Sequence, residues 1–387
     1  MTGREVVIVE AVRTPIGRGH PEKGYYRNTH ATELLGRTFA ELLSRAGVDP
    51  PAVDDVIAGC VQQYGEQSLN VARNAWLAAG LPFEVPATTV DRQCGSAQQS
   101  VNFAASQIAA GVNDVVVGGG VEHLGHVPMF VGMKWADEVG VPFSPELMAR
   151  YDLVPQGLSA EMIVDRWDIS RTELDEIGAR SQQNAVAATE EGRFAREVIP
   201  WELEGQIVTA DQGLRPDTTV ESLAELKPAF REDGKVTAGN SSQISDGAAA
   251  LLLTSREKAD ELGLKPRARI VDQVAVGVDP VIMLTGPIPA TRKLLERNGM
   301  RMGDIDLVEI NEAFASVVAA WQRELRPDMD RVNVNGGAIA LGHPLGSTGA
   351  RLLTTLLHEL ERSDREIGLV TMCCGGGIGT GTSIQRL

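Results

Sequence analysis

The sequence has few cysteines, few aromatic residues and no long hydrophobic run. Its 387 residues include four cysteines, which are too few and too widely spaced for a disulfide framework and lack the spacing of zinc ligands. No apolar stretch approaches the roughly 20 residues that cross a bilayer. The N-terminus runs straight into the strand-like residues 6–9, without a signal-peptide core. We therefore expect a cytoplasmic protein without membrane insertion.

The sequence also has fewer basic than acidic residues. It contains 36 basic and 52 acidic residues, so its formal net charge is −16. A strongly acidic surface disfavours nonspecific binding to nucleic acids or anionic membranes, and we expect neither as a partner. A polyanionic ligand would need a local basic patch. With only 4% aromatic residues, the core must be built mainly from Ala, Val, Leu and Ile.

The chain contains an internal repeat. Three segments of the first part recur in the same order in the second: 42–48 with 294–300, 53–56 with 305–308, and 115–117 with 369–372. The first two read as a helix closed by glycine, an acidic connection and a buried strand. Alternation of apolar strands with amphipathic helices favours mixed parallel sheets covered by helices. We predict two duplicated α/β halves.

Residues 121–240 have no counterpart in the second copy and interrupt the alternation. Ser170 and Glu173 predict a capping box at the start of a helix that runs to about Gly192. We interpret this stretch as an inserted lid or binding domain; the alternative is a solvated decoration. The predicted division is 1–120 with 241–268 as the N-terminal half, 121–240 as the insertion, and 269–387 as the C-terminal half.

Cys94 has the setting of a nucleophile. It follows the strand-like residues 88–90 and precedes Gly95, Ser96 and a predicted helix. A free thiol has a pKa of about 8.5. A helix N-terminus stabilises the thiolate, and a nearby imidazole could take the proton directly. The alternative is a buried structural thiol.

His343 is the histidine best placed to serve that cysteine. It lies in a Gly-rich loop whose close backbone packing would hold the ring in one orientation, although a surface histidine is the alternative. His123 and His126 form a spaced pair, but no carboxylate or thiol arrangement in the sequence completes a metal site, and we predict no bound metal. Three other histidines have polar neighbours and are expected to be solvated: His20, His30 and His358.

Cys373 and Cys374 end a predicted strand and open onto three glycines. Side chains alternate along a strand, so one thiol should enter a cleft and the other should pack. The glycine run, beginning with Gly375, exposes N–H groups that can bind an oxyanion, typically worth about 3–4 kcal/mol per donor.

Two polar segments complete the candidate site. Asn311 follows the repeated strand 307–310, at the end where α/β folds build their sites. The alternative for Asn311 is the N-cap of the next helix. Residues 239–247 form a small polar turn that could contact a ligand amide or phosphate, or simply shape a loop.

With these pieces together, the chain resembles the thiolase family along essentially its whole length. The matching segments are Asp91–Ser96, Gly239–Ala250, Asn311–Ala315, Asn335–Arg351 and Cys373–Gly379. The resemblance implies a duplicated five-layered α/β/α/β/α fold with an inserted loop domain, assembled as homodimers or homotetramers. It also implies thiolytic cleavage of 3-ketoacyl-CoA to acetyl-CoA and a shortened acyl-CoA, or the reverse Claisen condensation. Coenzyme A would be a co-substrate, with no permanently bound cofactor.

The resemblance also implies a role for each matched residue. Cys94 would attack the keto carbon and hold the acyl group as a thioester. His343 would help to activate Cys94 and, with a water held by Asn311, would bind the thioester oxygen of the enolate. Cys373 would be the acid/base that moves the α-carbon proton. The N–H groups of Cys94 and Gly375 would form a second oxyanion hole.

Three further positions align with coenzyme A contacts in the family: Arg215, Ser222 and Ser242. The motif from His123 to His126 resembles degradative 3-ketoacyl-CoA thiolases, whereas Met283 matches short-chain enzymes. The overall likeness is to actinobacterial thiolases of fatty-acid and sterol breakdown, a role compatible with association with other β-oxidation enzymes. The main alternative is a biosynthetic acetyl-CoA acetyltransferase that makes acetoacetyl-CoA. A lipid-binding or scaffold protein without turnover and a ketoacyl synthase are disfavoured, because Cys94, His343 and Cys373 are all present.

Overall fold

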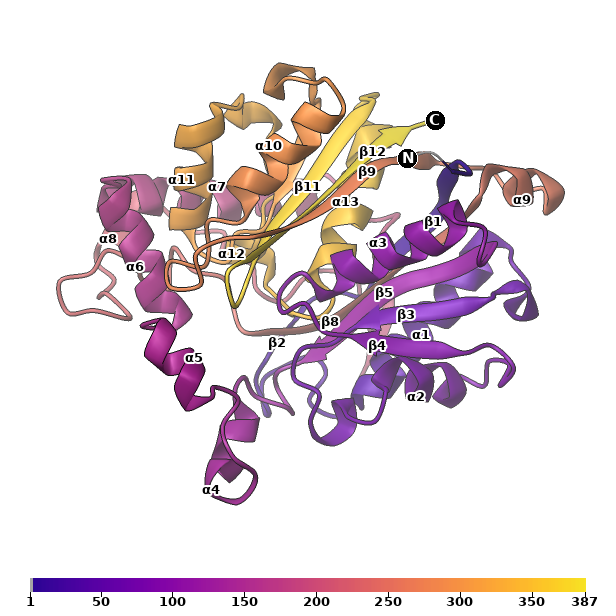
Figure 1. Ribbon diagram of the computed structural model, residues 1–387, viewed down its shortest axis with the longest axis horizontal. Coiled ribbons are helices and arrows are strands. Elements are labelled where there is room, and N and C mark those ends of the chain that lie inside the picture. Colours follow the sequence, from indigo (N-terminus) through magenta and orange to yellow (C-terminus); the bar gives the residue numbers. More distant parts are fainter. Residues whose placement is uncertain (1–2) are drawn as a thin grey trace.

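The structure is a computed structural model that describes residues 3–387, and its centre is a mixed sheet of ten strands (Figure 1). Nine strands follow the order β10-β11-β12-β9-β1-β8-β5-β3-β4, and β2 pairs with β8. The strands are β1 (Val6–Arg13), β2 (Gly17–Arg18), β3 (Asp55–Gly59), β4 (Ala87–Val90), β5 (Val115–His123), β8 (Ser245–Ser255), β9 (Ala268–Gly277), β10 (Leu307–Ile310), β11 (Ile367–Cys374) and β12 (Ile378–Arg386). A separate hairpin joins β6 (Trp201–Leu203) to β7 (Gln206–Val208).

Helices cover this sheet and form the inserted segment. The α-helices are α1 (Ala31–Ala46), α2 (Val71–Ala78), α3 (Ser96–Ala109), α4 (Ala136–Val139), α5 (Pro145–Arg150), α6 (Gln156–Arg166), α7 (Arg171–Glu190), α8 (Val220–Ala224), α9 (Arg256–Glu261), α10 (Pro287–Arg297), α11 (Ala315–Leu325), α12 (Ala338–Leu341) and α13 (Thr348–Arg362). No helix within residues 3–387 has the length and apolar character needed to cross a membrane.

The strand pairing shows the duplication. In the first half, β4-β3-β5 pair in parallel and β5-β8-β1 pair antiparallel. In the second half, a parallel bridge from Val332 to Val308 replaces the β4 pairing, β10-β11 is parallel, and β11-β12-β9 is antiparallel. The two halves meet where β1 pairs with β9 over only two residue pairs.

The repeated helix–strand units agree in detail. α1 ends where Gly47 adopts a φ of 67°, and α10 is followed by Gly299 with a φ of 63°, as the repeat predicts. Asp54 precedes β3, and one of its carboxylate oxygens accepts hydrogen bonds from the first residue of β5 and the residue before it. Asp306 precedes β10 and makes the same two bonds at the start of β11. The carboxylate ties neighbouring parallel strands at one edge in both copies.

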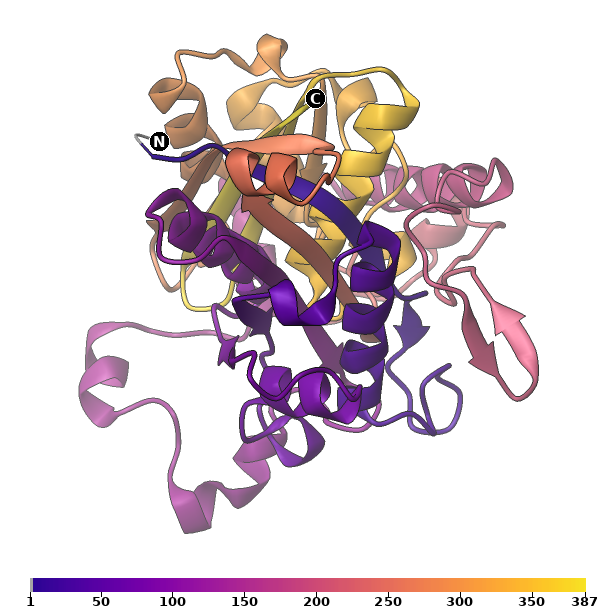
Figure 2. The ribbon, with the colours of Figure 1, turned by 90° about the vertical axis from the view of Figure 1, so that its right-hand side faces the viewer.

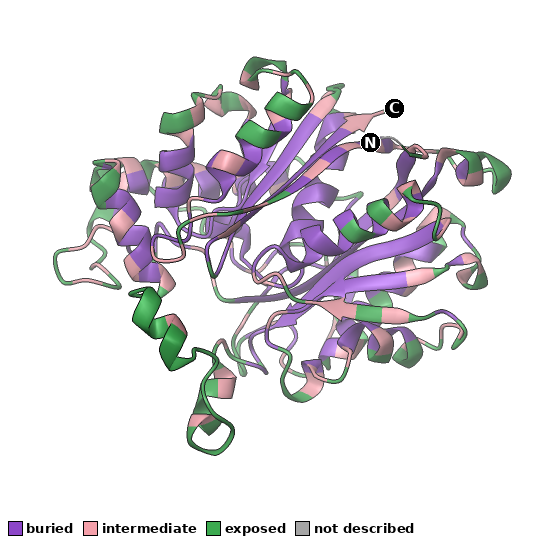
Figure 3. Cartoon of the chain, in the orientation of Figure 1, coloured by how far each residue is buried: buried purple, intermediate pink, exposed green. Residues whose placement is uncertain are grey.

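Five layers result. α1 and α2 pack outside the N-terminal strands; α10 packs outside the C-terminal ones, and α11 packs against α10. α3 and α13 pack against each other between the two groups of strands (Figures 1 and 2). A Cβ on Gly349 in α13 would lie 2.4 Å from the backbone nitrogen of Gln98 in α3, so only glycine allows this crossing. The central layer is almost wholly buried (Figure 3).

The inserted segment has two parts of different character. The capping box of Ser170 and Glu173 at the start of α7 is confirmed, and α6 and α7 pack against α11, with α7 also against α12. The part that carries α4 and α5 extends away from the body and is largely exposed (Figures 1 and 3). Its exposed apolar side chains are Phe130, Met133, Trp135, Val139, Val141, Phe143, Met148 and Tyr151.

Candidate active site

The chain carries Cys94 on a tight turn between β4 and α3. Gln93 adopts a φ of 50°, a left-handed conformation that typically costs a non-glycine residue about 1–3 kcal/mol. The Ser96 hydroxyl supports the turn by accepting from the Arg92 N–H (2.9 Å) and donating to the Gln93 carbonyl (2.6 Å). The turn holds Cys94 two residues before the first turn of the helix, only 5% exposed.

Burial dominates the electrostatics of this thiol. It raises the pKa of Cys94 to about 11, and the charges of Glu122 and Asp91 act in the same direction. Hydrogen bonding from the N–H groups of Gly375 and of Cys94 itself lowers the pKa, but by less. The expected stabilisation of the anion is therefore present but smaller than the cost of burial. The resting thiol is neutral and needs a base.

His343 is a neutral imidazole whose orientation is fixed. The Thr348 hydroxyl donates to the Pro344 carbonyl (2.8 Å), so it must accept the Nδ1–H of His343 at 2.7 Å. This assignment leaves Nε2 as the lone-pair nitrogen, 3.3 Å from Nδ2 of Asn311. Burial, with a smaller effect of the Arg351 charge, lowers the pKa of His343 to about 3. The ring is therefore buried and neutral, and the Nε2 lone pair faces the Asn311 amide.

The polar turn 239–247 positions this loop. The His343 N–H faces both the Gln243 carbonyl and the Ser245 hydroxyl, each at 3.2 Å. The Ser242 N–H donates to the carbonyl of Ala313 (3.0 Å), next to the Asn311 segment. The turn therefore links the two segments that carry His343 and Asn311.

Asn311 lies buried at the carboxyl end of β10, where its N–H donates to the Thr371 carbonyl (3.0 Å). α11 begins only at Ala315 with Phe314 as its N-cap, so the alternative that Asn311 caps this helix is wrong. Its Oδ1 is buried and has no hydrogen-bond partner among residues 3–387. Asn311 thus has an acceptor available beside the imidazole.

The two adjacent thiols at the end of β11 occupy different surroundings. Cys374 packs against the turn before α3, where its sulfur would lie 2.7 Å from a Cβ on Gly95. Cys373 belongs to the apolar cluster that contains Met283 and Phe314. Burial raises the pKa of both thiols, and a negative charge on Cys94 raises both further. Both sulfurs therefore lie close enough to Cys94 to respond to its charge.

The three residues aligned with coenzyme A contacts lie on the inserted segment and on the polar turn. Arg215 is exposed, and Ser242 is half-buried. Ser222 is exposed at the start of α8, where its hydroxyl donates to the Thr219 carbonyl (2.9 Å) as part of a capping box. Ser222 can therefore contact a ligand mainly as an acceptor while the cap is intact.

Sequence reasoning missed Glu122, the buried acidic residue near the end of β5. Its carboxylate accepts from the N–H groups of Val61 (3.0 Å), Gln62 (2.9 Å) and Gly346 (2.8 Å), so it ties the loop after β3 to the His343 loop. Burial raises its pKa to about 7. Its position two residues after three glycines, near a strand end, was the available signal.

Two expectations about histidines need correction. His358 is buried in the central layer, where its Nδ1 lies 2.8 Å from the Thr354 carbonyl and burial lowers its pKa to about 3, so it is not solvated. The pair of His123 and His126 does have a carboxylate partner, because the fold brings Glu66 to 2.9 Å from His126 Nδ1.

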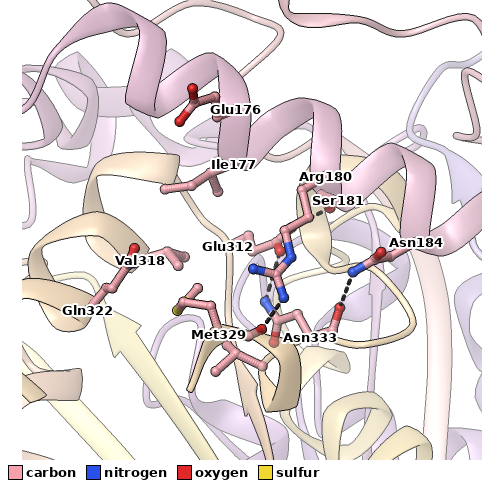
Figure 4. A pocket seen from close by; sticks show the side chains of 11 residues that line it. Glu176, Ile177, Arg180, Ser181, Asn184, Glu312, Val318, Gln322, Met329 and Asn333 are labelled. Carbon is pink, nitrogen blue, oxygen red and sulfur yellow. Dashed lines mark hydrogen bonds between the residues drawn. The ribbon is translucent and has the colours of Figure 1, made fainter. Parts of the chain in front are cut away.

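A separate pocket of about 240 Å³ lies between α7 and α11 (Figure 4). The Glu312 carboxylate closes its floor, accepting from the Ser181 hydroxyl (2.6 Å) and from the Asn333 amide (2.8 Å). Its lining includes neither Cys94 nor His343. The pocket is lined by Glu312, the neighbour of Asn311 in sequence, and by no cysteine.

The high pKa of Cys94 predicts how it reacts with iodoacetamide. The thiolate is the reactive species, so the alkylation rate should rise through pH 6 to 10 without a plateau near neutrality, because the pKa of about 11 lies above this range. Peptide mapping by mass spectrometry at several pH values measures the rate at Cys94 alone. A plateau between pH 6 and 8 would contradict the prediction by indicating a preformed thiolate–imidazolium pair.

Comparisons with known proteins agree with this geometry. Residues 6–257 match the family model of the thiolase N-terminal domain, and residues 264–386 match that of the thiolase C-terminal domain. The chain is 46% identical to a steroid 3-ketoacyl-CoA thiolase, FadA6, of Mycobacterium tuberculosis, over 99% of this chain and 94% of the relative. It is 45% identical to a 3-ketoacyl-CoA thiolase of Aeromonas salmonicida, over 99% of this chain and all of the relative.

A solved structure shows the same fold along the whole chain. The crystal structure of the Bacillus anthracis acetyl-CoA acetyltransferase superposes with a TM-score of 0.90 at 43% identity, covering 100% of both chains. Both domain models of the family therefore match this sequence, one after the other along the chain. The chain belongs to the thiolase family and is an acyltransferase of coenzyme A thioesters.

Proposed function

We propose that this thiolase works in the degradative direction, cleaving 3-ketoacyl-CoA with coenzyme A to give acetyl-CoA and a shortened acyl-CoA. One observation carries the proposal: a neutral, buried thiol at Cys94 adjoins the N–H of Gly375, while a neutral imidazole has its unprotonated Nε2 3.3 Å from Nδ2 of Asn311. A thiol with a pKa of about 11 requires that base.

In the first half-reaction, the Cys94 proton moves to Nε2 of His343 and the sulfur attacks the 3-keto carbon. The N–H groups of Cys94 and Gly375 hold the resulting oxyanion. The bond between the α- and β-carbons then breaks, and its electron pair forms the enolate of acetyl-CoA. The protonated Nε2, now a donor beside Asn311, stabilises the enolate oxygen, and Cys373 gives its proton to the α-carbon.

In the second half-reaction, the Cys373 thiolate removes the proton of the coenzyme A thiol. The coenzyme A sulfur attacks the acyl thioester on Cys94 and releases the shortened acyl-CoA. The Cys94 sulfur leaves with the bonding electrons and recovers its proton from His343. All three groups return to their starting protonation states, so the cycle needs no redox partner and no permanently bound cofactor.

Two features favour degradation, and two favour the biosynthetic alternative. The motif from His123 to His126 and the relatives named 3-ketoacyl-CoA thiolases support cleavage of longer substrates, including fatty-acid or sterol-derived acyl-CoA. Met283, buried in the same apolar cluster as Cys373, and the acetyltransferase structure support a small acyl group and synthesis of acetoacetyl-CoA. We propose degradation because the motif from His123 to His126, which resembles that of degradative enzymes, begins at the last residue of β5.

The remaining proposals concern binding and assembly. Arg215, Ser222 and Ser242 would contact coenzyme A, with the segment 121–240 as an insertion between the halves 1–120 with 241–268 and 269–387. We propose a homo-oligomer, supported by the edge position of β4 and by the exposed apolar side chains on residues 130–151. Four free cysteines support a reducing cytoplasm as its location.

Brief exposure to acyl-CoA followed by mass spectrometry tests the proposed function. Acetoacetyl-CoA should leave an acetyl group on the peptide that contains Cys94. Competition with longer and branched 3-ketoacyl-CoA substrates then ranks kcat/KM, and preference for a longer chain is the expected result. Strict preference for acetoacetyl-CoA would favour the acetyltransferase alternative, and absence of any acyl adduct would refute the mechanism.

A further inference from the structure

A cluster of histidines lies at the end of β5, apart from the thiols. His126 Nδ1 is 2.9 Å from Oε1 of Glu66, which lies in a short helical turn at residues 65–67. His123, Glu66 and His126 each offer one ligand-type atom, and these atoms all lie within 4.8 Å of one another. The His30 ring reaches the second carboxylate oxygen of Glu66, with Nε2 at 3.4 Å. Three imidazoles thus surround one carboxylate.

The hydrogen bonds that Nε2 makes in His123 and in His126 are of the kind that metal-bound histidines make. Nε2 of His123 faces the Tyr26 carbonyl at 3.0 Å, and Nε2 of His126 faces the Arg27 carbonyl at 2.8 Å. A carbonyl only accepts, so each ring must donate its Nε2–H. Metal-bound histidines are held in this way by backbone carbonyls, which fix the ring and its tautomer. Nδ1 therefore remains for coordination in His126, whereas Nδ1 of His123 accepts from the His126 N–H at 3.3 Å, a bond that an ion would have to replace.

The two rings are stacked, so one of them must turn before both Nδ1 atoms can face a single ion. They stack with centroids 3.9 Å apart and an interplanar angle of 18°. Between Nδ1 of His126 and the Glu66 carboxylate, a proton or a metal cation must mediate the contact, because both atoms carry lone pairs. Zn–N and Zn–O bonds of about 2.0–2.1 Å at a tetrahedral angle separate two ligand atoms by about 3.3 Å. The pair would therefore need to open by only a few tenths of an ångström.

We propose that His123, His126 and Glu66 form a binding site for a divalent transition metal of the Zn²⁺ class. Imidazole nitrogens with one carboxylate oxygen suit zinc and its neighbours in the first row. The Asp246 carboxylate, whose Oδ1 lies 3.5 Å from Nδ1 of His123, adds negative charge behind the ligands. His30 lies at the solvent side; its Nδ1 accepts from the Thr32 N–H (3.2 Å), so its Nε2–H faces the Glu66 carboxylate as a donor and not as a ligand.

Access to the site is open on one side and closed on the other. The side chain of His123 is fully buried, those of Glu66 and His126 are 16% and 27% exposed, and that of His30 is 53% exposed. A metal can therefore enter from solvent past His30. Bound there, it would join the segments 26–30, 65–67 and 123–126, which are distant in sequence. We infer a structural rather than a catalytic ion.

Titration of the purified full-length protein with Zn²⁺, and with Co²⁺ as a spectroscopic probe, tests the proposal. One ion per chain should bind, raise the thermal unfolding midpoint, and be removed by a chelator. Co²⁺ should give the visible absorption of low-coordinate nitrogen and oxygen ligation, without the near-ultraviolet charge-transfer band of a thiolate. His126→Ala and Glu66→Gln should each lower the affinity for the ion by at least about tenfold. Loss of a residue that only supports a metal ligand already costs about that much, and loss of a ligand should cost more.

Two controls separate this site from others on the chain. Cys94→Ser should bind the ion as tightly as the unaltered protein, because the site contains no thiol. His20→Ala removes an exposed histidine whose Nδ1 faces only its own loop, and should also leave binding unchanged. Loss of binding in Cys94→Ser, a thiolate band with Co²⁺, or full binding in both Glu66→Gln and His126→Ala would overturn the proposal. None of these outcomes bears on the acyl-transfer mechanism.

Discussion

Cys94→Ser is expected to lower kcat/KM for thiolysis by at least about 10³-fold and to leave no acyl adduct at position 94. A serine hydroxyl is a far weaker acid than a thiol, and burial already raises the pKa of the native thiol to about 11. The neutral imidazole of His343 would have to remove a proton that is much harder to detach. Steady-state thiolysis of acetoacetyl-CoA and intact-mass measurement of the adduct record both effects.

Cys60→Ser is the matched control for this change. Cys60 is a buried thiol after β3 whose Sγ faces the Glu122 carboxylate at 4.0 Å, away from the acyl chemistry. A hydroxyl can occupy the same place and donate to the same acceptor, so activity should stay close to normal. Near-normal thiolysis in Cys94→Ser would show that Cys94 is not the nucleophile, whatever the activity of the control.

Cys373→Ala should separate the two chemical steps. Acyl transfer from acetyl-CoA to Cys94 needs the thiol of Cys94 and the base at His343, so some acylation should persist. Condensation to acetoacetyl-CoA should fall by about 10²–10⁴-fold, the usual contribution of a positioned acid/base. Exchange of the acetyl-CoA methyl protons with deuterated water should fall with it, because that exchange requires the same proton transfer. Mass spectrometry and NMR measure the two steps independently.

The neighbouring Cys374→Ala provides the comparison. Cys374 packs against Gly95 and near the Thr380 hydroxyl, so its loss removes a buried sulfur and should mainly lower stability. Proton exchange and condensation should survive in this variant. If instead Cys374→Ala abolished exchange while Cys373→Ala kept it, the two thiols would have exchanged roles.

The sequence predicted the fold well because the relevant signals are local. Glycines after the two repeated helices, a capping box at Ser170, a β-branched strand before Cys94 and a buried strand before Cys373 all follow from short-range chemistry. These signals, with the repeat and the resemblance, also indicated which residues carry the site.

Electrostatics and long-range partners were harder to predict. The pKa of Cys94 depends on how deeply the thiol is buried, which the helix N-terminus motif does not report. Glu66 reaches His126 across 60 residues of sequence, so no local pattern links them. His358 has polar neighbours in sequence but lies on α13, whose central position buries nearly every face. Each depends on which layer a segment occupies.

The tight crossing of α3 and α13 has a consequence for how this protein can diversify. Cys94 lies just before α3 and His343 just before α13, and the helices touch where Gly349 leaves no room for a methyl group. The spacing between nucleophile and base is thus set by rigid packing at the centre, whereas residues 121–240 lie outside it. We expect new substrate preferences to arise through changes in residues 121–240, while the reacting groups keep their distance.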